Sequence, residues 1–185
     1  MGYQPRQGLK QWPNSDSRGA NVPDIFPDPA TPSRSPAMAS THISLNYHIV
    51  FATKDRQRRI ETSWRSRLHE YIGGTIRGLD GHSHIVGGVE DHVHVLAGLR
   101  ATRALADVVR EIKKCSSLWI HEELRYPGFA WQAGYAAFTV GPRDLPSVMR
   151  YIANQEEHHR VSSFREELVD FLSRAGVEYD PRYLD

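Results

Sequence analysis

Two histidines spaced two residues apart are the first side chains in this sequence that are suited to chemistry. The segment Asp91–Leu96 (DHVHVL) alternates histidine with valine, which predicts a buried strand. Side chains at positions i and i+2 of a strand share one face, so His92 and His94 should project side by side. Neutral imidazole is a good ligand for divalent transition metals, and this spacing therefore predicts that the two histidines bind one metal ion.

A tyrosine and a glutamine one helical turn apart form the second candidate group. They lie in the segment 145–159, which is expected to be a helix, and at about 100° per residue Tyr151, Gln155 and His158 share one face of it. Gln155 could add a carbonyl oxygen to a metal shell. A phenol has a pKa near 10, so Tyr151 would need help from a metal bound to a phosphate to act as a nucleophile. The product would be a phosphotyrosine ester, which suits cutting and rejoining of strands.

Each pattern also has a structural interpretation. A His-x-His pair in a strand is often incidental, and His82 and His84 repeat the pattern, which makes them candidates for strand-edge residues. Tyr151 could be a packing residue of its helix. His158 and His159 could cap the helix end, where positive charge is favourable.

The remaining segments predict the elements that would position these side chains. Hydrophobic periodicity and turn residues indicate strands at 43–53, 84–89, 92–99 and 134–140, and helices at 64–79, 104–123, 145–159 and 163–175. Thr62 or Ser63 is the expected N-cap of the first helix, and His48 is expected in the core or on a sheet face. The order strand, helix, strand, strand, helix, strand predicts an α+β, ferredoxin-like split βαβ fold with an antiparallel sheet, helices packed on it, and C-terminal helices.

Length and composition predict one folded domain preceded by a leader. The chain has 185 residues, and seven of its eleven prolines fall within residues 1–37. We therefore expect a disordered Pro/Ser-rich leader at 1–38 and a single domain at 39–185. The one cysteine, Cys115, excludes an internal disulfide framework and indicates a reducing compartment, so we expect a cytoplasmic protein. No apolar run reaches about 18 residues, so no membrane span is expected.

Basic residues gather in two runs, although the net charge is only +1. On charge alone either run could be a solvated surface, but both flank the predicted metal site, which favours contact with phosphate groups. The candidates are Lys54, Arg56, Arg58, Arg59, Arg103, Arg110, Lys113 and Lys114.

Three blocks of the sequence resemble a known family. They are Asp91–Leu96, Phe129–Tyr135 (FAWQAGY) and Tyr151–Gln155 (YIANQ) with His158 and His159 following. Their order and separation are similar to those of the single-tyrosine HUH transposases of small bacterial insertion sequences, the transposase A type. REP-associated tyrosine transposases are close relatives of that family.

The resemblance implies a function for each candidate residue. A DNA transposase of this type would cleave and rejoin single-stranded DNA at hairpins near the element ends. Tyr151 would form a 5′-phosphotyrosine link, while His92, His94 and Gln155 would hold a divalent metal, Mg²⁺ or Mn²⁺. The family works as a homodimer, and the tyrosine helix can pack against the partner's histidines to make composite active sites.

Other functions stay open at this point. The chain could be a domesticated relative that cuts chromosomal repeat hairpins without mobilising itself. It could also be a non-catalytic module that holds single-stranded nucleic acid with its sheet and basic runs. A metal-dependent hydrolase that uses activated water would need neither Tyr151 nor a covalent intermediate.

Overall fold

The computed structural model describes residues 42–160 and 163–183 of the chain, which fall within one compact unit, Thr41–Asp185. The leader predicted at 1–38 and the predicted start of the domain at residue 39 lie outside the described residues. The proposed boundary between leader and domain therefore stays a prediction.

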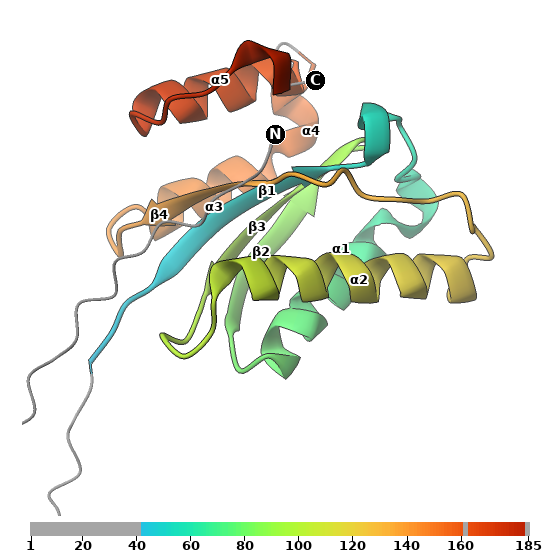
Figure 1. The fold of residues 1–185 in the computed structure, drawn as a ribbon, viewed down its shortest axis with the longest axis horizontal. Coiled ribbons are helices and arrows are strands. Elements are labelled where there is room, and N and C mark those ends of the chain that lie inside the picture. Colours follow the sequence, from blue (N-terminus) through green and yellow to red (C-terminus); the bar gives the residue numbers. More distant parts are fainter. Residues whose placement is uncertain (1–41, 161–162, 184–185) are drawn as a thin grey trace, which may run out of the picture. The chain divides into compact units, whose positions relative to one another are not determined.

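A four-stranded antiparallel sheet forms the centre of the described unit (Figure 1). The strands lie in the order β2-β3-β1-β4, so β2 and β4 are the edges. The elements are β1 (Asn46–Ala52), α1 (Thr62–Gly78), β2 (His82–Gly88), β3 (His92–Gly98), α2 (Leu105–Glu123) and β4 (Ala136–Val140). This order and this sheet confirm the predicted α+β, ferredoxin-like arrangement.

Helices α1 and α2 cover one face of the sheet and form the main core with it (Figure 1). Side chains alternate between the two faces of a strand, so β1 and β3 give every second residue to this core. The strand residues in it are Ile49, Phe51, Val93, Val95 and Ala97, all no more than 1% exposed. The helices add apolar positions at helical spacing, such as Leu68 and Ile72 of α1 and Ile112 of α2.

The opposite face of the sheet carries the polar alternates and is covered by the C-terminal helices. These are α3 (Leu145–Ala153), α4 (Gln155–His158) and α5 (Phe164–Arg174), which lie together across the sheet from α1 and α2 (Figure 1). Two small apolar clusters hold them there. One joins Val50 and Ala52 to Phe164, and the other joins Leu96 and Val140 to Ile152. Single 3-10 turns occur at η1 (Lys54–Arg56) and η2 (Pro181–Tyr183).

Two sequence-based expectations about helices were wrong in detail. The helix expected at 145–159 is broken at Asn154, whose φ of −102° and ψ of 21° end α3 before α4 begins. Figure 1 shows α4 leaving in a different direction from α3. The N-cap of α1 is Glu61, without a side-chain cap hydrogen bond, and not Thr62 or Ser63. By contrast, α5 begins with a full capping box between Ser163 and Glu166.

Within the described ranges, no helix is both long enough and apolar enough to cross a membrane.

Candidate active site

His92 and His94 lie side by side on the face of the sheet that α3, α4 and α5 cover. The register pairs Ala52 with His92 and Val50 with His94, which places both imidazoles opposite the main core. Both side chains are 0% exposed. The pattern His-Val-His therefore positions the two rings as predicted, with the valines on the other face.

Each of the two imidazoles is held through its Nδ1 atom. His92 Nδ1 lies 2.6 Å from Asp91 Oδ1, and His94 Nδ1 lies 2.9 Å from His48 Nε2. A partner at one ring nitrogen fixes the orientation of the ring and leaves the other nitrogen available as a ligand. Asp91 and His48 thus orient both rings so that their Nε2 atoms face the carboxylate of Glu167. His48, which lies on the same face of the sheet, therefore positions the ring of His94.

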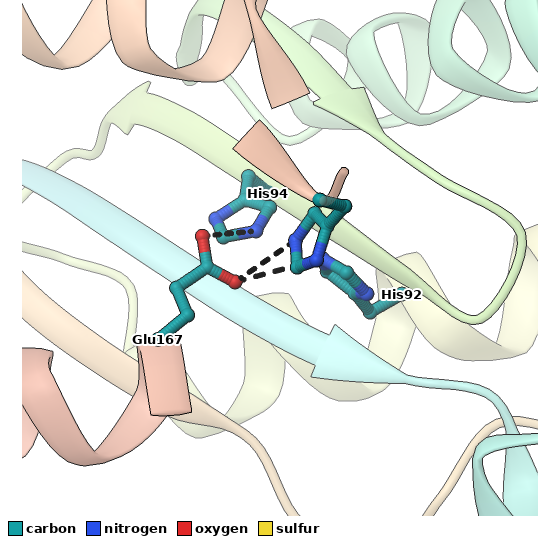
Figure 2. A group of neighbouring side chains, drawn as sticks. His92, His94 and Glu167 are labelled. Carbon is teal, nitrogen blue, oxygen red and sulfur yellow. Dashed lines mark ion pairs between the residues drawn. The ribbon is translucent and has the colours of Figure 1, made fainter. Parts of the chain in front are cut away.

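Glu167 of α5 brings its carboxylate to these two Nε2 atoms. Its Oε2 lies 3.7 Å from His92 Nε2, and its Oε1 lies 3.5 Å from His94 Nε2. Figure 2 shows the carboxylate pointing between the two rings. His159, just after α4, adds a third imidazole, with its Nε2 3.2 Å from Glu167 Oε2. One ligand atom from each of His92, His94, His159 and Glu167 can be chosen so that all four lie within 4.8 Å of one another.

The protonation states in the cluster follow from its burial. Burial, together with neighbouring imidazoles, holds the pKa of His94 well below its ordinary value, so the ring is neutral and able to bind a metal. Burial likewise lowers the pKa of His48 to about 4. Burial raises the pKa of Glu167 to about 8, and the nearby Asp91 charge acts in the same direction. An ionised Glu167 therefore requires positive charge close to it.

The unsatisfied polar atoms of the cluster fit a divalent metal ion. Among the described residues, the buried atoms that make no hydrogen bond include His92 Nε2, His94 Nε2, Gln155 Oε1 and Glu167 Oε2. Buried polar atoms without partners are costly, and those of His92, His94 and Glu167 lie close enough together to serve as ligands of one ion. Imidazole, carboxylate and amide donors are also suitable chemical types for Mn²⁺ or Mg²⁺.

Tyr151 stands beside this cluster, in the same chain. Its ring centroid is 5.9 Å from that of His94 and 5.1 Å from that of His158. The hydroxyl is buried and makes no hydrogen bond within the described part of the molecule. Gln155 is 1% exposed, and its Nε2 donates to Glu167 Oε1 over 3.0 Å. Tyr151, Gln155 and His158 therefore gather as predicted, although two helices and not one carry them.

Sequence reasoning did not identify Glu167, and it treated His159 only as a helix-capping residue. One signal for Glu167 is present in the sequence, because this carboxylate interrupts the apolar stripe Phe164, Leu168 and Phe171 of an amphipathic helix. A charged residue on the buried face of a helix needs a partner, which makes it a candidate site residue. For His159 we find no comparable signal, since its position depends on the break at Asn154.

The first basic run lies near the end of β1, and part of it borders the cluster. Arg58 lines a polar cavity of about 480 Å³ together with Asp91, His159 and Arg160. Arg56 lies over the Phe164 ring at 4.7 Å, and Lys54 is exposed. Arg59 instead donates to Gly128 O over 2.6 Å, which gives it a structural contact. Arg58 is thus the predicted basic residue best placed to meet a phosphate at the cluster.

The second basic run lies on or just before α2, across the sheet from the histidines. Lys113 donates to the backbone oxygens of Gln132 and Gly134 over 2.9 and 2.6 Å, which holds the segment before β4. Arg110 and Lys114 are exposed and pair with acidic neighbours on their own helix. Arg103 is exposed and lies 3.9 Å from Asp80. These side chains can contact DNA only away from the cluster.

Comparison with known proteins adds to this geometry. The family model described as "Transposase IS200 like" matches residues 41–155, more than half of the chain. The chain belongs to the IS200-like transposase family. The resemblance noted in the sequence is thereby confirmed. Among curated proteins, no match to this transposase is found.

Two solved structures share the fold of this IS200-like transposase. A protein from Deinococcus radiodurans R1, assigned as a transposase, is 21% identical, with a TM-score of 0.51 over 62% of this chain and 93% of that one. A REP-associated tyrosine transposase bound to a REP hairpin is 16% identical, with a TM-score of 0.50 over 65% of this chain and 72% of the other. At these identities the likeness concerns the fold.

Proposed function

We propose that this IS200-like transposase cleaves and rejoins single-stranded DNA at hairpin-marked element ends, with Tyr151 as the nucleophile. The observation that carries the proposal is that Tyr151 lies beside the paired imidazoles of His92 and His94 within one chain. The solved REP-associated relative is bound to a REP hairpin, which supports a hairpin as the DNA element recognised here. The protein would act in the cytoplasm, where DNA is accessible to it.

The proposed reaction exchanges one phosphodiester for another. Tyr151 Oη attacks the scissile phosphorus, the bond from phosphorus to the 3′ oxygen breaks, and a 5′-phosphotyrosine and a free 3′-hydroxyl result. A 3′-hydroxyl of another strand can later attack the same phosphorus and release Tyr151, so rejoining needs no ATP. His158 lies next to Tyr151 and is our candidate acceptor of the phenol proton.

His92, His94 and Gln155 are the proposed protein ligands of the divalent ion. Mg²⁺ or Mn²⁺ bound there would neutralise the non-bridging oxygens of the scissile phosphate and lower the barrier to attack. Asp91 and His48 keep the two imidazoles in the required orientation through the hydrogen bonds to Nδ1. The basic residues Lys54, Arg56, Arg58, Arg59, Arg103, Arg110, Lys113 and Lys114 remain the proposed DNA contacts, with Arg58 nearest the cluster.

A covalent-adduct assay tests this function. Purified protein is incubated with labelled single-stranded DNA from the flanks of its own gene, with Mn²⁺, Mg²⁺ or chelator, and run on a denaturing gel. We expect a metal-dependent adduct that Tyr151→Phe and His92→Ala abolish. Tyr71→Phe is the matched control, because Tyr71 packs on Trp119 of α2, on the other side of the sheet. An adduct that persists in Tyr151→Phe would refute the assignment, and binding without any adduct would indicate a non-catalytic module.

We further propose a homodimer in which each active site belongs to one chain, because a single chain already brings Tyr151 to His94. Mixing Tyr151→Phe with His92→Ala protein distinguishes the arrangements. Composite sites would restore adduct formation in the mixture, whereas sites within one chain would not. Light scattering of the wild-type protein measures the oligomeric state independently.

A further inference from the structure

The carboxylate of Glu167 lies at the centre of the imidazole cluster, although it comes from the last long helix of the chain. Glu167 is 4% exposed, and it belongs to α5, beyond residue 155 where the family match ends. Its two oxygens divide between the imidazoles, with Oε1 nearest His94 and Oε2 nearest His159. Figure 2 shows that it points toward His92 and His94.

A buried carboxylate in this position needs a positive charge, and imidazoles that bind a metal are neutral, so as ligands they do not supply one. The nearest side chains are the imidazoles and the amide of Gln155, while the buried guanidinium of Arg65 is engaged by Glu90 and Glu156. A buried ionised group is stable only when it is paired or coordinates a metal. A divalent ion among the Nε2 atoms would provide the missing charge.

We infer that Glu167 and His159 are direct protein ligands of the divalent ion, in addition to the residues named above. This inference rests on the proposed function, because it extends the metal site that the function requires. It changes the character of that site, since two imidazoles and an amide are neutral, whereas Glu167 adds a negative charge and a hard oxygen donor. The carboxylate suits Mn²⁺ and Mg²⁺, and the third imidazole favours Mn²⁺ over Mg²⁺.

Gln155 has a second task in this arrangement. Its amide Nε2 donates to Glu167 Oε1, which fixes the carboxylate, while its own Oε1 is buried and makes no hydrogen bond to the described residues. The amide can therefore orient Glu167 with one end and face the ion with the other. Metal binding would tie α5 to β3 and α4, so the ion should stabilise the C-terminal helix against the sheet.

Mn²⁺ binding without DNA tests the inference, because it does not depend on catalysis. Free Mn²⁺ is followed by its electron paramagnetic resonance signal during titration of the full-length protein and its variants. We expect Glu167→Gln to weaken Mn²⁺ binding by roughly 100-fold, and Glu167→Asp to restore part of the loss. Asp170→Asn is the matched control, because Asp170 is an exposed carboxylate on the same helix that pairs with Arg174. The Asp170→Asn protein should bind Mn²⁺ with the affinity of the wild type.

Thermal unfolding shows whether Glu167→Gln has lost a metal ligand or has failed to fold. Glu167→Gln removes a buried carboxylate and keeps its shape, so the metal-free variant should unfold at the wild-type temperature or above. Added Mn²⁺ should raise the unfolding temperature of the wild type and of Asp170→Asn, but not that of Glu167→Gln. A Glu167→Gln protein that binds Mn²⁺ within twofold of the wild type would overturn the inference.

The adduct assay shows which of the two proposals has failed. If the wild type forms an adduct through Tyr151 and Glu167→Gln binds Mn²⁺ normally, the function stands and the ligand assignment is wrong. If Glu167→Gln loses Mn²⁺ but Tyr151→Phe still forms the adduct, the ligand assignment stands and the nucleophile is wrong.

Discussion

Gly87 of β2 sets how closely the helix that carries Tyr151 can approach the sheet. A Cβ atom at position 87 would lie 2.6 Å from the backbone oxygen of Ile152 and 2.7 Å from its Cγ2. Restoring an ordinary contact of 3.4 Å requires α3 to move by about 0.8 Å, because backbone and not a flexible side chain blocks the space. Ile152 follows Tyr151 directly, so Gly87→Ala should displace the nucleophile.

Two consequences of Gly87→Ala can be estimated. Overpacking of this size costs about 1–3 kcal/mol of unfolding free energy, which corresponds to a fall of about 2–10 °C in the unfolding temperature. A misplacement of nearly 1 Å at a reacting group lowers a rate by roughly 100-fold. We therefore expect a folded, less stable protein whose rate of adduct formation falls about 100-fold.

The assay compares adduct rate and thermal unfolding of Gly87→Ala with those of Gly74→Ala. Gly74 lies within α1, where a Cβ would meet only the end of Arg77 at 3.7 Å, so alanine should be neutral or stabilising by up to about 1 kcal/mol. If Gly87→Ala kept the wild-type unfolding temperature and adduct rate, the close approach of α3 would not position Tyr151, and this reasoning would be refuted.

Three further predictions concern stability and DNA binding. Burial, aided by the Arg65 charge, lowers the pKa of His69 to about 4. Between pH 6.5 and 4 the unfolded chain therefore binds a proton at this residue that the folded chain does not. The free energy of unfolding should fall by about 1–2 kcal/mol over this pH range. Urea titrations at several pH values should show this slope, and His69→Gln should flatten it; an unchanged slope would contradict the assignment. Arg65→Lys should cost about 1–3 kcal/mol in urea unfolding, because an ammonium cannot bridge Glu90 and Glu156 as the guanidinium does over 2.9 and 2.7 Å. Equal stability of the wild type and the Arg65→Lys variant would show that the bridge contributes nothing. Arg110→Gln and Lys114→Gln should each reduce the slope of log binding constant against log salt concentration for hairpin DNA by about one unit. The adduct yield at saturating DNA should stay unchanged. A slope equal to that of the wild type would show that α2 does not contact the DNA.

The strands, and the pairing of His92 with His94, could be predicted because they depend on local alternation. Valine and histidine alternate along 92–95, and the requirement that valine face the core fixes the direction of the imidazoles. The order of strands and helices then restricts the fold to few arrangements. These features follow from short-range patterns that a single sequence contains.

The break at Asn154 and the position of Glu167 could not be predicted in the same way. An uninterrupted helix is the simplest interpretation of 145–159, because no glycine occurs there and Pro146 lies in the first turn. The break is coupled to contacts that are distant in sequence, since Gln155 binds Glu167 and Arg65 of α1 binds Glu156 of α4. Sequence patterns identify residues that share an element, but they do not specify which elements meet over a site.

Helix α5 covers the cluster as well as contributing to it. Phe164 stacks on His92 with ring centroids 4.3 Å apart, and Phe171 lies 5.2 Å from His48 and 5.6 Å from Tyr151. With His92 and His94 fully buried, a DNA strand cannot touch them in this arrangement. A DNA strand therefore reaches these two imidazoles only if α5 moves away from the sheet.

If such an opening precedes the reaction, the observed rate is the chemical rate multiplied by the fraction of open protein, and each 1.4 kcal/mol or so that favours the closed form lowers that fraction tenfold. Apolar residues of α5 such as Leu172, which is 8% exposed, would then influence the speed of the proposed reaction without taking part in its chemistry.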